Sequence, residues 1–129
     1  MKKSFFIIYL NSVIITFIIL YLSFFNPPKV PELNTIAFVD KWVHVVLYTF
    51  YTLIMAFDFT KDGARIFKKT YYWGVCVAFP ILLGGLIEIL QVTFFPPRTA
   101  EWMDWAADAT GVLIGMSLHK LYFLIFKKR

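Results

Sequence analysis

The amino-acid sequence predicts an all-α fold, an integral membrane bundle of four transmembrane helices. Of its 129 residues, 60% are hydrophobic and only 16% are charged, whereas a soluble domain is nearer half apolar and a quarter charged. The apolar residues gather into long uncharged runs, which is typical of membrane spans rather than of a large soluble core. Most of the ionisable residues stand at the ends of these runs.

The whole chain, residues 1–129, is predicted to form one domain. Its helices are expected over about residues 4–25, 39–58, 71–95 and 101–125. The first run, Ser4–Phe25, contains no charge, and at about 1.5 Å per residue it can cross a bilayer core of about 30 Å. A cleaved signal peptide is the competing interpretation, but its apolar region is normally shorter and ends at small residues. A retained helix is therefore favoured.

Polar residues follow one face of the second helix. Lys41, His44, Tyr48 and Thr52 recur at helical spacing, so they form a polar stripe. The segment that follows, Asp58–Thr70, is the most basic connection and is predicted to be a loop.

An aromatic belt and a proline mark the third helix. Its first residues, Tyr71–Trp73, are of the kind that lies at a membrane interface. Pro80 removes a backbone hydrogen bond, so it predicts a kink. Gly84 and Gly85 next to it allow another helix to approach closely.

The third and fourth helices are predicted to form a tight hairpin. Pro96-Pro97 ends the third helix, and Thr99 is expected to cap the fourth, with Glu101 in its first turn. Gly111 and Gly115 lie four residues apart in the fourth helix, a spacing that marks close helix packing. Packing within the bundle is the favoured use of these glycines, and a homo-oligomer formed through them remains the alternative.

The distribution of basic residues predicts the orientation. Ten of them lie near the two termini and in the middle connection: Lys2, Lys3, Lys61, Arg65, Lys68, Lys69, Lys120, Lys127, Lys128 and Arg129. The other two connections contain only Lys29, Lys41 and Arg98. Since basic residues favour the cytoplasmic side, both termini are predicted to be cytoplasmic.

This orientation gathers polar residues at the extracytoplasmic ends of three helices. The candidate ligand-binding residues are Asp40, Lys41, His44, Tyr48, Glu88, Gln91, Arg98, Asp104 and Asp108. Ionisable groups near hydrocarbon are costly, so in a membrane protein they indicate function by default. His44, Glu88 and Asp104 are candidates for acid/base catalysis.

A purely structural role for this cluster is the competing hypothesis. Arg98 is expected to contact Glu88, Asp104 or Asp108, and Lys41 could pair with Asp108. Pairs of this kind could do no more than assemble the bundle, although pairing is also expected at a functional site because isolated charges are costly there.

Several classes of site find no support in the sequence. The net charge of +5 comes from residues at helix ends, so no nucleic-acid partner is predicted. His119 is expected at the opposite membrane surface from His44, and no metal site or cofactor is predicted, although Asp and Glu oxygens could hold a hard cation. Cys76 is the single cysteine and is interpreted as a packing residue.

The order of the polar motifs resembles that of the VanZ-like membrane proteins. The resemblance is carried by Asp40-Lys41-x-x-His44-x-x-x-Tyr48, Glu88-x-x-Gln91, Pro97-Arg98, and Asp104 with Gly111 and Gly115. It covers most of the chain from Val39 to Gly115, while Asp108 stands where that family commonly has asparagine. It implies a multi-pass protein of the bacterial cytoplasmic membrane, in a family linked to resistance to the glycopeptide teicoplanin.

Three classes of function fit these residues. The leading hypothesis is a protein that binds an amphiphilic or lipid-linked cell-envelope molecule in its polar cleft, with Lys41 and Arg98 holding an anionic head group. The second is a membrane-embedded enzyme that uses His44 or an acid on a lipid-linked substrate. The third is a small proton-coupled exporter, which is less favoured because the charges lie near one surface rather than at the midplane.

Overall fold

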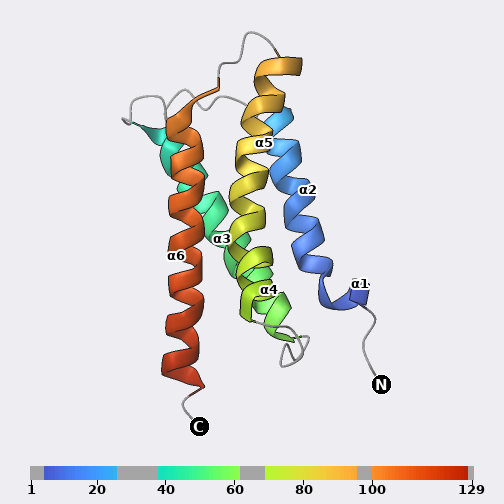
Figure 1. The fold of residues 1–129 in the computed structure, drawn as a ribbon, viewed down its shortest axis with the longest axis vertical. Helices are drawn as coiled ribbons and strands as arrows, with labels where there is room; N and C mark the ends of the chain where they lie inside the picture. The colour runs from blue at the N-terminus through green and yellow to red at the C-terminus, as the bar shows by residue number, and fades with distance from the viewer. Residues whose placement is uncertain (1–4, 26–37, 62–68, 96–99, 128–129) are drawn as a thin grey trace.

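The computed structural model describes residues 5–25, 38–61, 69–95 and 100–127, and these residues are helical apart from short turns. The elements are α1 (Phe5–Ile8), α2 (Leu10–Phe24), α3 (Val39–Lys61), α4 (Lys69–Trp73), η2 (Gly74–Ala78), α5 (Phe79–Phe94) and α6 (Trp102–Phe126), as Figure 1 shows. The described residues contain no strand. The all-α prediction is confirmed for this part of the chain.

Among the described residues, three helices are long and apolar enough to cross a membrane. They are Val39–Lys61, Thr70–Phe94, which joins α4, η2 and α5 into one rod, and Trp102–Phe126. Helix α2 is also apolar but has only 15 residues. The chain therefore has the composition and helix lengths of a multi-pass membrane protein.

The first predicted helix is interrupted, and in this respect the prediction of one helix over residues 4–25 is wrong. The chain bends at Tyr9, between α1 and α2. In an unbroken helix the N–H of Ser12 would donate to the carbonyl of Ile8. It donates instead to the carboxylate of Asp58 on α3, at 2.9 Å. The bend thus exposes the first turn of α2 to a side chain from another helix.

Asp58 caps helix α2 from within α3, which continues to Lys61, three residues beyond the end expected from the sequence. Its side chain is only 1% exposed. Besides the Ser12 N–H, it accepts hydrogen bonds from Ser12 Oγ at 2.9 Å, Asn11 Nδ2 at 3.2 Å and Lys61 Nζ at 3.1 Å. A carboxylate at a helix N-terminus satisfies unpaired N–H groups and interacts favourably with the helix dipole. Asp58 therefore joins the start of α2 to the end of α3.

Helix α3 is the centre of the bundle, and its most extensive contact is with α6. A methyl group at Gly111 would lie 2.5 Å from the carbonyl oxygen of Val45 and 2.9 Å from Cβ of Tyr48. At Gly115 it would lie 2.7 Å from the carbonyl oxygen of Thr49. Both glycines therefore allow α6 to approach the backbone of α3. Packing within the chain, the use favoured from the sequence, is the use found.

Pro80 is accommodated by a wide helical turn. Proline has no N–H to donate to the carbonyl of Cys76, four residues earlier. The preceding residues, Gly74–Ala78, form a π-helix, and the N–H of Phe79 donates to the carbonyl of Gly74. The rod thus continues past the proline with a local change of pitch.

The end of the bundle that contains Asp58 also holds Cys76 and His119. Cys76 is fully buried and packs in a cluster with Ala56, Phe59 and Met116, as expected of a packing residue. His119 is buried, and its Nδ1 lies 2.9 Å from the hydroxyl of Tyr72. It lies on α6 eleven residues beyond Asp108, roughly 16 Å along the helix, well away from the polar residues at the start of α6.

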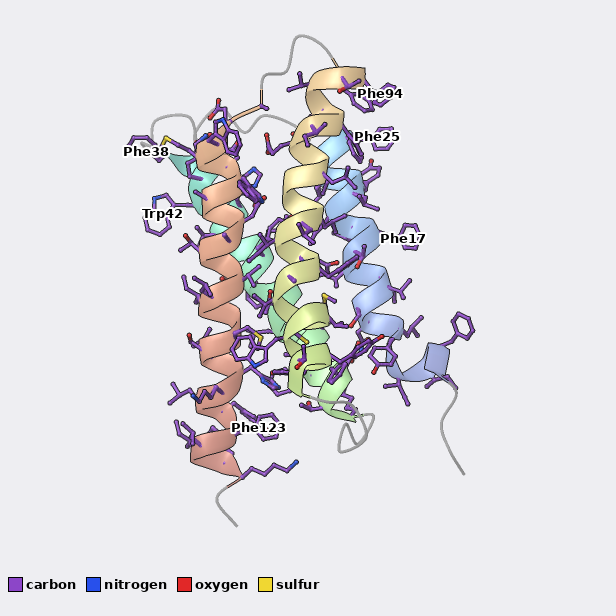
Figure 2. The ribbon with its side chains drawn as sticks, in the orientation of Figure 1. Phe17, Phe25, Phe38, Trp42, Phe94 and Phe123 are labelled. Atoms are coloured by element: carbon purple, nitrogen blue, oxygen red, sulfur yellow. The ribbon has the colours of Figure 1, made fainter. Side chains whose placement is uncertain are left out.

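The outer surface is apolar and aromatic. Phe17, Phe25, Trp42 and Phe94 point away from the bundle in Figure 2, and all four are exposed. A surface of this kind suits contact with lipid. The described chain begins and ends at the lower end of the bundle in Figure 1, where α3 also ends and α4 begins. The opposite end contains the starts of α3 and α6 and the end of α5.

Candidate functional site

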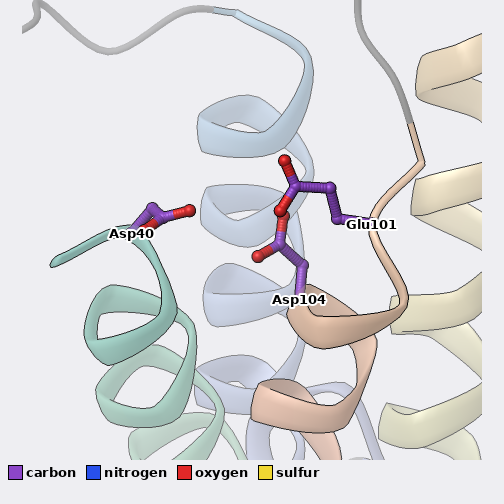
Figure 3. Close-up of side chains that lie close together, drawn as sticks. All are labelled: Asp40, Glu101 and Asp104. Atoms are coloured by element: carbon purple, nitrogen blue, oxygen red, sulfur yellow. The ribbon is translucent and has the colours of Figure 1, made fainter. Parts of the chain in front are cut away.

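The first turns of α3 and α6 bring three carboxylates around one lysine, a group that we call the Lys41 cluster (Asp40, Lys41, Glu101 and Asp104). The ammonium of Lys41 lies 2.6 Å from Oδ2 of Asp40 and 2.6 Å from Oδ1 of Asp104, and it donates a hydrogen bond to Glu101. Figure 3 shows the three carboxylates converging. One oxygen from each carboxylate lies within 4.8 Å of the other two, a spacing that could hold a cation. The ammonium of Lys41 already lies among them.

One turn further into the bundle, His44 pairs with Asp108. Nδ1 of His44 lies 2.7 Å from Oδ1 of Asp108. Because an ionised carboxylate only accepts hydrogen bonds, Nδ1 carries the proton and donates it. Asp108 is buried, whereas His44 is partly exposed. Lys41 therefore pairs with Asp104 and not, as the sequence suggested, with Asp108.

Gly84 of α5 lies against the carboxylate of Asp108 in this pair. A methyl group there would lie 2.6 Å from Oδ2 of Asp108 and 3.2 Å from the hydroxyl of Tyr48. Tyr48 is itself buried in the core. Only glycine leaves room for both polar groups, so Gly84 positions α5 against the His44–Asp108 pair.

Glu88 is a buried carboxylate with few partners. Its side chain is one turn along α5 from Gly84, and the residue is 7% exposed. One oxygen accepts a hydrogen bond from the backbone N–H of Glu101 at 3.3 Å. Within the described residues, no basic side chain forms an ion pair with it. Most of the interaction capacity of this carboxylate is therefore unused in the described part of the chain.

An apolar groove runs between α5 and the start of α6, beside the polar residues. Its volume is about 370 Å³, and its walls include Leu86, Ile89, Trp102 and Trp105. Glu88 and Glu101 also line it. Leu86, Ile89 and Trp102 are exposed, so the groove opens sideways, toward the surface that would face lipid.

One of the predicted site residues, Gln91, is not brought into the polar cluster. Nε2 of Gln91 donates to the backbone carbonyl of Ser23 at 2.6 Å, so this side chain ties α5 to the end of α2. Arg98 lies outside the described residues, as does Thr99, and so does the contact expected between Arg98 and the three acids. The remaining candidates, Asp40, Lys41, His44, Tyr48, Glu88, Asp104 and Asp108, gather at one end of α3, α5 and α6.

Glu101 is the main residue that the sequence reasoning missed. It was expected merely to start the fourth helix, but it is the residue before α6, and its own side chain makes no capping hydrogen bond. It contacts Lys41 and, through its N–H, Glu88. Its spacing of three from Asp104 was the available signal, since residues three apart share one face of a helix.

The chain was also compared with known proteins. No family model, curated protein or solved structure matches it. The resemblance to VanZ-like proteins stays a prediction from the order of the sequence motifs.

Proposed function

We propose that the chain is a four-span protein of the bacterial cytoplasmic membrane, with both termini in the cytoplasm. Helix α2 is the fourth span: it is apolar and packs beside α3, and its 15 residues extend over roughly 22 Å. The ten basic residues near the termini and the middle connection support the orientation. The Lys41 cluster then faces the extracytoplasmic side.

At that side the protein binds an amphiphilic or lipid-linked molecule of the cell envelope. The observation that supports this function is the meeting of the apolar groove with the polar residues at Glu88 and Glu101. A ligand can place its hydrocarbon along Leu86 and Ile89 while its head group stays at the polar end. Concave apolar sites with a few polar groups are the usual form of small-molecule sites. A VanZ-like role in glycopeptide (teicoplanin) resistance is compatible with such a ligand.

A second candidate is a membrane-embedded enzyme, favoured by the His44–Asp108 pair. A buried carboxylate that holds Nδ1–H of a histidine fixes its tautomer and leaves Nε2 as a general base, the arrangement of many hydrolases. His44 would then activate water or a hydroxyl group on a lipid-linked substrate. Glu88 or Asp104 would serve as the acid. His44→Gln separates the two functions, because only an enzyme loses turnover while retaining its ligand.

The binding function is tested by filling the groove. Ile89→Trp replaces an aliphatic side chain in the wall of the groove by a larger indole ring. Leu113→Trp is the matched control, because Leu113 is exposed on α6 and does not line the groove. Thermal melts of purified protein are recorded with and without a total lipid extract of bacterial envelope. We expect the extract to raise the melting temperature of the wild type and of Leu113→Trp but not of Ile89→Trp. Equal stabilisation of all three would contradict binding in the groove.

The orientation is tested by labelling single cysteines with an impermeant thiol reagent in intact cells. The background is Cys76→Ala, which removes the single native cysteine. Glu101→Cys should react from outside, whereas Lys61→Cys should react only after the cells are opened. The reverse pattern would place the polar site in the cytoplasm.

A further inference from the structure

The polar end of the bundle carries more acid than base. Among the described residues, Asp40, Glu88, Glu101, Asp104 and Asp108 face only Lys41 and His44. Even with Arg98 of the connecting segment included, the acids outnumber the bases. An anionic head group would add to this excess of negative charge, and a cationic one would offset it.

Lys41 is not available to hold an anion. Its ammonium has three carboxylates around it, and its side chain is 14% exposed. The ammonium donates hydrogen bonds to Asp40 and Glu101 and lies 2.6 Å from Oδ1 of Asp104, so three carboxylates already occupy the positions that a phosphate or carboxylate of a ligand would need. The anionic head group expected from Lys41 and Arg98 is therefore disfavoured on the Lys41 side.

Glu88 stands where the groove meets the polar residues. It is more than nine-tenths buried, has no side-chain partner in the described part of the chain, and lines the groove together with Glu101. Near hydrocarbon a carboxylate is costly, and a cation next to it is bound more strongly than in water. The indole face of Trp102 or Trp105 can add a cation–π contact.

We propose that the ligand of this groove is a membrane amphiphile with a protonated amine in its head group. This inference deepens the proposed function and rests on it. The hydrocarbon chain lies between α5 and α6 along Leu86 and Ile89. The ammonium lies at Glu88 and Glu101, where it donates charge-assisted hydrogen bonds to the two carboxylates.

The experiment compares three probes that differ only in the head group: ω-bromododecylammonium, ω-bromododecanol and ω-bromododecanoate. Bromine quenches the fluorescence of nearby tryptophan. The protein is reconstituted in phosphatidylcholine vesicles as the double variant Trp42→Phe/Trp73→Phe, which keeps the two tryptophans of the groove. The matched control keeps Trp42 and Trp73 and changes Trp102 and Trp105 to Phe, so it reports on the surrounding lipid.

We expect saturable quenching at the groove, with the ammonium probe binding about tenfold more tightly than the alcohol and the carboxylate most weakly. Glu88→Gln should remove most of this preference and leave alcohol binding unchanged. Glu101→Gln, at a more exposed position, should reduce the preference for the ammonium probe by a smaller factor. This variant tests the inference if Glu88→Gln does not fold.

The outcomes separate this inference from the binding function. Saturable quenching that is equal for the three probes would overturn the inference and leave amphiphile binding intact. Tighter binding of the carboxylate would also overturn it and would favour Arg98 as the partner of an anion. Quenching that never saturates, and equals that of the control, would overturn both.

Discussion

Asp58 and Glu88 are both buried carboxylates, and they lie at opposite ends of the bundle. Asp58 accepts hydrogen bonds from the Asn11 amide, the Ser12 hydroxyl, the Ser12 backbone N–H and the Lys61 ammonium. Glu88 accepts one, from the backbone of Glu101, among the described residues. The two carboxylates are thus similarly buried but accept very different numbers of hydrogen bonds from the described residues.

The difference lies in where the donors come from. Asn11, Ser12 and Lys61 belong to helices that pack around Asp58 whether or not a ligand is present. Glu88 lines an open groove, so further donors can come from outside. A buried carboxylate with several internal donors contributes to stability, whereas one that accepts a single hydrogen bond from the described residues and lines a groove is a candidate for binding.

The largest expected effect is that of Asp58→Ala. It leaves the Ser12 N–H and the Asn11 amide without their acceptor, so we expect a loss of about 3 kcal/mol in the free energy of unfolding. Glu88→Gln should cost about 1 kcal/mol or less, because among the described residues it alters a single backbone hydrogen bond. Reversible unfolding in mixed detergent micelles measures both. If Glu88→Gln lost more free energy of unfolding than Asp58→Ala, the assignment of Asp58 to stability and Glu88 to binding would be wrong.

Gly84→Ala should have an intermediate effect. Its methyl group would meet Oδ2 of Asp108 at 2.6 Å, so either the carboxylate or α5 has to move, at an expected cost of about 2 kcal/mol. Gly74→Ala is the matched control, since a methyl group there meets no heavy atom within 4 Å. The same unfolding measurement compares them. Equal stability of the two variants would show that α5 is not held closely against the His44–Asp108 pair.

The smallest expected effect concerns divalent cations. Lys41→Met removes the ammonium from among three carboxylates whose oxygens lie within 4.8 Å of one another, so Ca²⁺ should then stabilise the protein by roughly 1 kcal/mol. Lys61→Met at the other end is the control, because Lys61 contacts a single carboxylate, that of Asp58. Melting temperatures with millimolar Ca²⁺ and with a chelator test this. A calcium response of the wild type would mean that Lys41 does not occupy the cation position.

The helices themselves could be predicted closely from the sequence. The bounds of α3, of the rod Thr70–Phe94 and of α6 differ from the expected ones by a few residues, because long apolar runs and the two prolines define them. The bend at Tyr9 could not be predicted. It depends on Asp58, 46 positions from Ser12, and neither residue belongs to a pattern that reveals such a contact.

The candidate site was predicted as a region rather than as a set of pairs. Helical spacing placed Lys41 and His44 on one face of the second predicted helix, and Asp104 and Asp108 on one face of the fourth. Which acid meets which base depends on how far α6 is shifted along α3. That shift is set by Gly111 and Gly115 against the α3 backbone, a matter of packing distances that spacing alone does not contain.

The π-helix before Pro80 determines the rotational phase of the whole rod. Tyr72 and Glu88 are sixteen positions apart, which in an unbroken α-helix would point them to nearly opposite sides, roughly 160° apart. The π turn takes up one extra residue and so subtracts roughly 100°, leaving about 60°. Tyr72 can therefore reach His119 while Glu88 reaches the residue before α6. One extra residue in the rod thus keeps Tyr72 and Glu88 facing the same neighbouring helix region around α6.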